Sequence, residues 1–163
     1  MLERILRVIR LDQGVFAEVE QDKSLTAEAF VIVLSTSLLS ALGAGFGGSW
    51  SFLRGFVGEL FSGIILGWIV WAAITYWIGT RIYDGDADMG EMLRTLGYAS
   101  APRLLGLLQI IPLIGWLFVL IGWGVSLVAG FLAVREALDI DTPKAIATVL
   151  IGWIIFIVFS IIF

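Results

Sequence analysis

A stretch of 23 residues, PLIGWLFVLIGWGVSLVAGFLAV at positions 112–134, decides the fold class because it contains no charged side chain. At about 1.5 Å of rise per residue, a helix of this length crosses a hydrocarbon core of roughly 30 Å. Three further apolar runs cover residues 29–45, 57–79 and 145–163. The sequence therefore predicts a polytopic membrane protein.

The overall composition also indicates a protein whose solvent is lipid. Apolar residues make up 60% of the chain and charged residues 15%, and the mean hydropathy is +1.01. A water-soluble domain of 163 residues could not bury this much apolar surface. Inside lipid the backbone must satisfy its own hydrogen bonds, and the runs lack the two-residue alternation of a membrane β-barrel. We therefore predict an all-α fold.

Cys and His are both missing from the sequence, which excludes several kinds of chemistry. The chain contains no Cys and no His, so it lacks thiol nucleophiles, disulfides, imidazole acid–base catalysts and the usual zinc ligands. We expect no enzymatic activity, no cofactor and no metal site. The formal net charge is −4. Since no basic patch is typical of a nucleic-acid interface, nucleic acid is not an expected partner.

Residues 95–111, TLGYASAPRLLGLLQII, leave the number of spans open between four and five, because Pro102 and Arg103 lie near their centre. Cytoplasmic loops carry the excess of Lys and Arg. Five spans with the N-terminus inside place eight such residues in the cytoplasm and one outside, whereas four spans give seven against three. We therefore predict a membrane domain over residues 27–163, in the cell (plasma) membrane and with the C-terminus outside. Its spans cover about 27–45, 57–79, 95–111, 113–134 and 144–163.

Residues 1–26 are predicted to form a cytoplasmic segment that begins with an amphipathic helix. In MLERILRVIRL, residues 1–11, the side chains of Leu2, Ile5, Leu6 and Ile9 share one helical face, and charged side chains occupy another. Such a basic helix lies on the membrane surface or docks under the helices of the membrane domain. The two arrangements are compatible.

Small residues recur along the spans, often at steps of four. Helices in lipid associate through close packing of such residues, because lipid tails are as apolar as the helix side chains. We predict helix contacts at Gly63, Gly67, Gly122, Ser126 and Gly130. These stripes suit either a compact monomer or a homodimer, and they do not tell which helices meet.

Arg103 is the costliest residue of the predicted membrane domain, since Arg at the centre of a membrane helix costs about 2.5 to 3.5 kcal/mol to insert. Either it snorkels to the cytoplasmic interface or a group within the protein compensates it. Pro102 frees the carbonyl of Tyr98 as an acceptor, and Glu59 shares a helical face with the small residues of its span. We predict an intramembrane polar site of Glu59, Tyr98, Pro102 and Arg103. Carbonyls and water are the first expected partners of Arg103, and Glu59 is the second.

Two short charged segments between the spans need no ligand. The loop 84–91, DGDADMGE, has alternating acids but lacks the Gly and Glu that a calcium loop requires at fixed positions. We predict instead that Asp88 caps the next helix in a capping box with Glu91. After the fourth span, Arg135 and Glu136 are expected to form a salt bridge at the cytoplasmic rim.

Several motifs together resemble the bacterial and archaeal branch of the Yip family, the Ypt/Rab-interacting membrane proteins. They are GYASAP at residues 97–102, AVREALDI at 133–140 and KAI at 144–146, in this order and spacing. The resemblance implies a five-helix membrane domain with a cytoplasmic N-terminus, which is also what the charge distribution predicts. The long cytoplasmic domain of the eukaryotic members and its Asp-Leu-Tyr-Gly-Pro-type motif are missing, so Rab binding is not implied.

Two functions remain open from the sequence. The first is a membrane scaffold or interaction protein of the Yip type that binds the bilayer, other membrane proteins or a second copy of itself. The alternative is an oligomeric transporter or channel for an ion or small solute, with Glu59, Arg103 and Tyr98 lining a polar path, because ionisable residues inside a membrane often mark functional sites.

Overall fold

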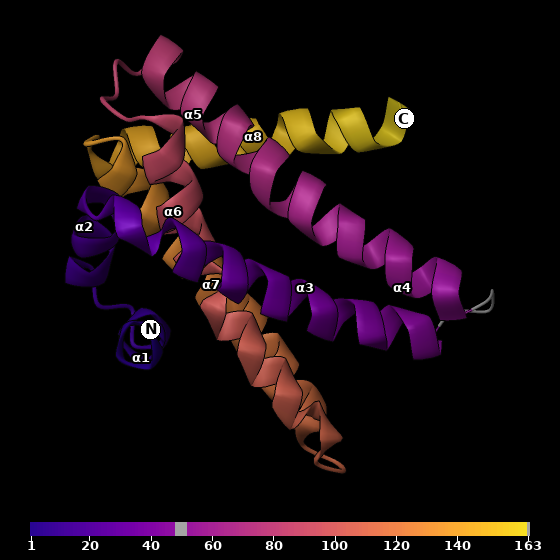
Figure 1. The fold of residues 1–163 in the computed structure, drawn as a ribbon. Helices are drawn as coiled ribbons and strands as arrows, with labels where there is room; N and C mark the ends of the chain where they lie inside the picture. Colours follow the sequence, from indigo (N-terminus) through magenta and orange to yellow (C-terminus); the bar gives the residue numbers. More distant parts are fainter. Residues whose placement is uncertain (48–51, 163) are drawn as a thin grey trace.

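The computed structural model describes residues 1–47 and 52–162, and this part of the chain is almost entirely helical (Figure 1). The all-α prediction is confirmed. In chain order the elements are α1 (Leu2–Ile9), α2 (Gly14–Gln21), η1 (Lys23–Leu25), α3 (Thr26–Gly47), α4 (Phe52–Phe61), η2 (Ser62–Val70), α5 (Trp71–Ile82), α6 (Met89–Ala99), η3 (Ala101–Ile110), α7 (Gly115–Ala137) and α8 (Thr142–Ile162).

Three arms project from a common centre in Figure 1. One is a helical hairpin in which α3 lies beside the continuous helix α4–η2–α5. The second is a hairpin of η3 and α7, and the third is α8. In the described part of the chain, three helices are long and apolar enough to cross a membrane: Lys23–Gly43, Phe52–Ile82 and Gly115–Ala137. They correspond to the first, second and fourth predicted spans. A shorter apolar helix, Thr142–Ile155, lies in the fifth.

The third predicted span is not one regular α-helix. Its first part belongs to α6, which begins before the predicted boundary, and its second part is the 3₁₀-helical η3. The change begins just before Pro102, at Ser100, whose amide donates to the Gly97 carbonyl three residues back at 3.2 Å. Pro102 itself has no N–H to donate to the carbonyl four residues earlier. The next amide, that of Arg103, donates to the carbonyl of Ser100 at 3.1 Å, three residues back. The helix is therefore tightened around Pro102, where the sequence suggested a disruption.

The middle of the second span is also irregular, because η2 has the wider turns of a π-helix. Such segments are rare and often lie at functional sites. Here the π-helical segment contains Gly63 and Gly67, and its residues Leu66 and Gly67 line the cavity described below.

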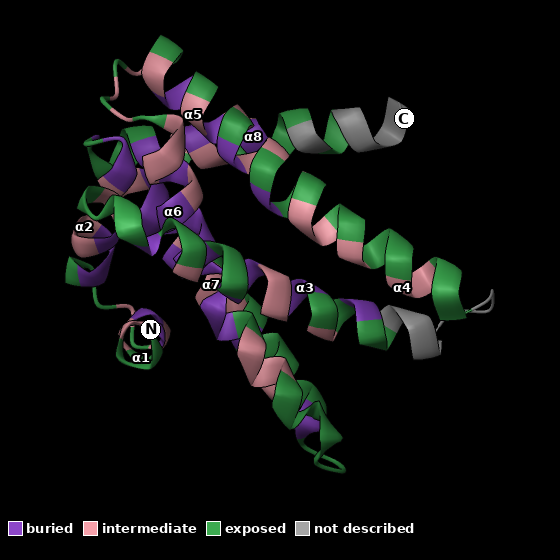
Figure 2. Ribbon diagram, in the orientation of Figure 1, coloured by how far each residue is buried: buried purple, intermediate pink, exposed green. Residues whose placement is uncertain are grey.

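The buried core lies at the centre from which the arms project, and we call this centre the hub: α1, α2, α6 and the adjoining ends of α3, α5, α7 and α8. Figure 2 shows buried residues gathered there and exposed residues along the arms. Phe16, Met92 and Leu138 are fully buried in the hub, whereas α4 has no buried residue. Arms that face lipid need little burial inside the protein, because the surrounding solvent is itself apolar.

The N-terminal helix α1 docks on the rest of the hub, with a face that overlaps only in part with the apolar face that the sequence predicted. Ile5 and Val8 are buried, while Leu2 and Leu6 are exposed by 70% and 47%. Ile9 is partly buried and packs against the core, so the contact includes Ile5 and Ile9 of the predicted face together with Val8, and leaves out Leu2 and Leu6. The exposed leucines give α1 an apolar surface on the side that faces away from the buried core.

Local capping follows the sequence more closely. The side chain of Asp88 accepts from the Glu91 amide at 2.8 Å, and the Glu91 carboxylate accepts from the Asp88 amide at 2.6 Å. The predicted capping box is thus confirmed. The salt bridge between Arg135 and Glu136 is also present, with 3.8 Å between its closest atoms.

Candidate functional site

An ion network holds the N-terminal segment together, and we call it the N-terminal network. Glu18 on α2 accepts hydrogen bonds from Arg4 at 2.6 Å and from Arg7 at 2.7 Å, both on α1. Arg7 also donates to Asp12 at 2.7 Å. The hydrogen bonds and charges of these guanidinium groups hold the pKa values of Glu18 and Asp12 below their ordinary range.

Tyr98, one of the predicted site residues, links this network to the membrane helices. Its side chain is fully buried, and its hydroxyl donates to the carboxylate of Glu28 at the start of α3. The same carboxylate lies 3.4 Å from the Met1 amino group and 3.5 Å from Arg4. Sequence reasoning missed Glu28, because the residue lies 70 positions from its partner.

Gly97 explains how Tyr98 reaches that carboxylate. A Cβ at position 97 would lie 2.9 Å from the Cβ of Ala29, so only glycine lets α6 approach α3 this closely. The Gly-Tyr pair of α6 therefore meets the Glu28-Ala29 pair of α3. This contact assigns a structural role to the first two residues of the GYASAP motif.

A second polar cluster joins α6 to α2. Arg94 is buried, and its guanidinium donates to the carbonyls of Val19, at 3.1 Å, and Glu20. The Glu20 side chain has a buried oxygen, Oε2, without a hydrogen-bond partner in the described part of the chain. Burial raises the pKa of Glu20 to about 7, and the nearby carboxylates of Asp139 and Glu136 add to this effect.

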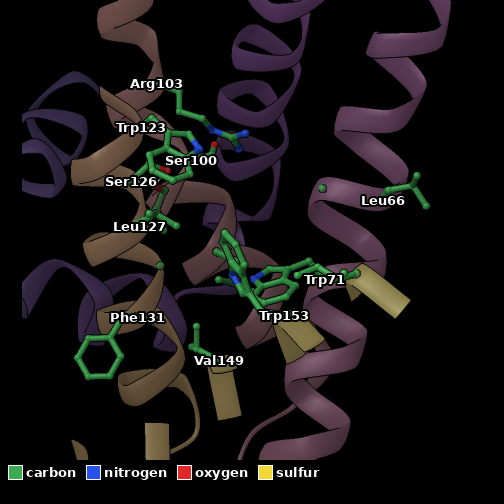
Figure 3. Close-up of a pocket in the computed structure, with 15 residues that line it drawn as sticks. Leu66, Trp71, Ser100, Arg103, Trp123, Ser126, Leu127, Phe131, Val149 and Trp153 are labelled. Atoms are coloured by element: carbon green, nitrogen blue, oxygen red, sulfur yellow. Dashed lines mark hydrogen bonds between the residues drawn. The ribbon is translucent and has the colours of Figure 1, made fainter. Parts of the chain in front are cut away.

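Arg103 lies elsewhere, at a cavity between the arms. The cavity has a volume of about 380 Å³ and is bounded by η2, α5, α6, η3, α7 and α8. In Figure 3, Arg103, Ser100 and Trp123 lie near one end, Trp71 and Trp153 in the middle, and Phe131 and Val149 toward the other end. The side chain of Arg103 extends from η3 toward the helix that carries Leu66.

The predicted four-residue site is therefore not brought together. Tyr98 points to Glu28, away from the cavity that Arg103 lines, and Pro102 is buried against α7. Glu59 is exposed and attracts Arg103 electrostatically, but no ion pair joins them within 4 Å. Among the described residues, no hydrogen bond from the Arg103 guanidinium is found, so neither predicted class of protein partner is in place.

Three of the five small residues lie at tight helix contacts. A Cβ at Gly63 would lie 2.7 Å from Ser37 Oγ, and one at Gly122 would lie 2.6 Å from the carbonyl oxygen of Pro102. Ser126 donates its hydroxyl hydrogen to the carbonyl of Ala99 at 2.8 Å. These contacts join α3 to η2 and α7 to the α6–η3 segment.

The other two small residues, Gly67 and Gly130, do not pack closely against a neighbouring helix of the same chain. A Cβ at Gly130 would meet nothing within 4 Å, and one at Gly67 would meet only its own helix, at 3.8 Å from the Ser62 carbonyl. Both glycines line the cavity beside Arg103. Their missing side chains create open space where the sequence suggested close contact.

The predicted rim pair has a further partner. Arg135 donates to the side-chain oxygen of Gln13 at 2.8 Å, in addition to its salt bridge with Glu136. This bond ties the end of α7 to the residue that precedes α2. The rim is therefore part of the hub.

The comparison with known protein families identifies this architecture. The family model described as the Yip1 domain matches residues 8–163, which is nearly the whole chain. No curated protein and no solved structure matches the chain significantly. The matched region contains the membrane-length helices, the Gly97-Tyr98 contact and the Arg135 rim. The chain thus belongs to the Yip1 domain family of membrane proteins.

Proposed function

We propose that this protein is a multi-pass membrane scaffold that acts by binding other membrane components and catalyses no reaction. The observation that carries the proposal is the hub, in which segments distant in sequence are joined by specific polar contacts. Arg135 binds Gln13, Arg94 binds the end of α2, and Tyr98 binds Glu28. Such contacts hold several helices in a fixed arrangement, as a binding platform requires.

The same contacts support five spans over four. The Asp86 amide donates to the Leu138 carbonyl at 3.0 Å, so the loop after the second predicted span and the loop after the fourth lie on one side of the membrane. The bond between Arg135 and Gln13 adds the N-terminal segment to that side. With the excess of Lys and Arg in these segments, the side is the cytoplasm. We therefore propose a C-terminus outside, in a protein of the plasma membrane.

The transporter alternative depends on a continuous polar path through the membrane helices. A polar path would need Glu59, Tyr98 and Arg103 to line one channel, but the Tyr98 hydroxyl is bonded to Glu28 in the hub. The cavity at Arg103 is bounded mainly by apolar and aromatic side chains. These features favour a protein that binds membrane components over one that conducts ions or small solutes.

The partner surface that we propose includes the exposed side of α1. Leu2 and Leu6 remain exposed although the helix is docked through Ile5 and Val8. Expected partners are the bilayer, other membrane proteins or a second copy of this chain, and neither nucleic acid nor a Rab protein is proposed.

Site-specific photocrosslinking in native membranes tests the scaffold. A photoreactive residue at Leu6 should give discrete protein adducts, whereas the same probe at Leu113, an exposed residue at the far tip of the η3–α7 hairpin, should give none or different ones. Identical adducts at both positions, or none at Leu6, would contradict a platform on α1.

Proteoliposomes test the alternative directly. The purified protein in liposomes should leave ion and solute fluxes at the level of empty liposomes. A flux that rises with protein and falls in Arg103→Leu would favour the transporter and overturn the scaffold proposal.

A further inference from the structure

The cavity at Arg103 has the features of a ligand site rather than a packing defect. Its volume of about 380 Å³ lies within the range of small-molecule pockets, roughly 300 to 1,000 Å³. Gly67 and Gly130 contribute to this space because neither carries a side chain that would fill it. A void of this size between helices is costly if it stays empty, since its walls lose their contacts.

The position of the opening limits the source of a ligand. Trp123, Leu127 and Trp153 line the cavity and still are 52%, 40% and 41% exposed, so the cavity opens at the surface beside these side chains. Leu120, Ile121 and Ile154 surround them on the same helices and are exposed as well. Because this apolar surface faces lipid in a membrane, an occupant enters from the bilayer.

The polar groups of the cavity select the charge of that occupant. Arg103 contributes a guanidinium group with five N–H donors. The indole N–H groups of Trp123 and Trp153 are further donors, and none of the described lining residues is acidic. Ser100 and Ser126 already donate to backbone carbonyls. The cavity therefore offers a positive charge and the Trp123 donor at one end, the Trp153 donor in the middle, and apolar walls along the rest.

We propose that the cavity binds one anionic phospholipid. Its phosphate group accepts hydrogen bonds from Arg103, and one acyl chain lies among Trp71, Trp123 and Trp153. The phosphate compensates the charge of Arg103, for which the described residues provide no ion pair within 4 Å. This lipid site goes beyond the scaffold role and does not depend on it.

The test uses the full chain, purified in a mild detergent, with lipid binding measured by native mass spectrometry. Phosphatidylglycerol should bind the parent protein at least about tenfold more tightly than phosphatidylcholine, because only the first carries a net negative charge. Arg103→Gln should remove this preference, and Arg103→Lys should keep most of it. Glycerol 3-phosphate, the headgroup without its chains, should neither bind nor compete.

A second pair of variants tests the cavity without touching its charge. Gly130→Leu places a side chain in the open space and should weaken phosphatidylglycerol binding by about tenfold or more. Gly124→Leu is the matched control, because a Cβ there also meets nothing within 4 Å but the residue does not line the cavity. It should bind lipid like the parent.

Three results would overturn the proposal: equal affinity of the parent for the two phospholipids, unchanged binding in Gly130→Leu, or binding of glycerol 3-phosphate as tight as that of the lipid. If Arg103→Gln does not fold, Arg103→Lys and the glycine pair still decide the question. Proteoliposome flux and crosslinking at Leu6 do not depend on these outcomes. The lipid site and the scaffold role can therefore be refuted independently of each other.

Discussion

Glu20 illustrates how one buried carboxyl group makes the hub sensitive to pH. Its pKa is raised from 4.5 to about 7, so the folded protein prefers the protonated form more strongly than the unfolded chain does. The resulting stabilisation is complete below about pH 4.5 and is lost as the pH rises through 7. The direction follows from burial, to which Asp139, Glu136 and Glu91 add while Arg94 opposes.

We therefore predict that Glu20→Gln raises the thermal stability of the protein at pH 8 and changes it little at pH 5. The variant removes a charge whose burial costs up to about 3 kcal/mol at high pH. Melting temperatures in detergent at the two pH values measure the effect, and Glu3→Gln on the exposed side of α1 is the control. An equal shift at both pH values would show that Glu20 does not titrate as described.

Tyr98 provides a second test of the hub. Tyr98→Phe removes the hydroxyl that donates to Glu28 and leaves that carboxylate with only its longer contacts to Met1 and Arg4. We expect a loss of about 1 to 3 kcal/mol in the free energy of unfolding, together with faster proteolysis of the N-terminal segment. Tyr83→Phe should change neither, and a fully stable Tyr98→Phe would remove the hydroxyl bond from the account.

The helices could be predicted to different extents, depending on how local their determinants are. The capping box of α6 depends on Asp88 and Glu91 alone, and the apolar length of α7 is visible in one run of sequence, so both were predicted correctly. The face of α1 that docks depends on α2 and the membrane helices, which no local pattern describes. The 3₁₀-helical η3 contains Pro102, which is a signal visible in the sequence, whereas no sequence pattern marked the π-helical η2.

Helix contacts could also be predicted only in part, because the spacing of small residues does not tell which groups of another helix face them. We predict that Gly63→Leu and Gly122→Leu lower the melting temperature in detergent, since each places a side chain against Ser37 or the Pro102 carbonyl. Overpacking of this kind costs about 1 to 3 kcal/mol or more.

Gly130→Leu is the comparison for these two variants and should melt close to the parent, because its side chain enters open space. If Gly130→Leu were destabilised as strongly as Gly63→Leu, the small residues would act as a uniform packing stripe and the cavity would be closed in solution.

The arrangement of all the helices brings into contact segments that lie far apart in the sequence. The charge count predicts that residues 81–94 and 135–144 are cytoplasmic, and the hydrogen bond between Asp86 and Leu138 brings these two loops into contact. The hub and the cavity could not be predicted, because Glu28, Gln13 and the glycine-lined space acquire their roles only through partners far away in the chain.

Cysteine labelling in whole cells decides the topology that follows from this contact, since the natural chain has no thiol. Leu113→Cys should react with an impermeant reagent from outside, whereas Asp86→Cys and Asp139→Cys should react only after the membrane is opened. Four spans would exchange the sides of positions 113 and 139 and leave position 86 inside. That outcome would require the Asp86 amide and the Leu138 carbonyl, 3.0 Å apart, to lie on opposite faces of the membrane. Labelling of Asp139→Cys from outside would therefore contradict the five-span topology and the hub together, while Leu113→Cys reacting alone would support both.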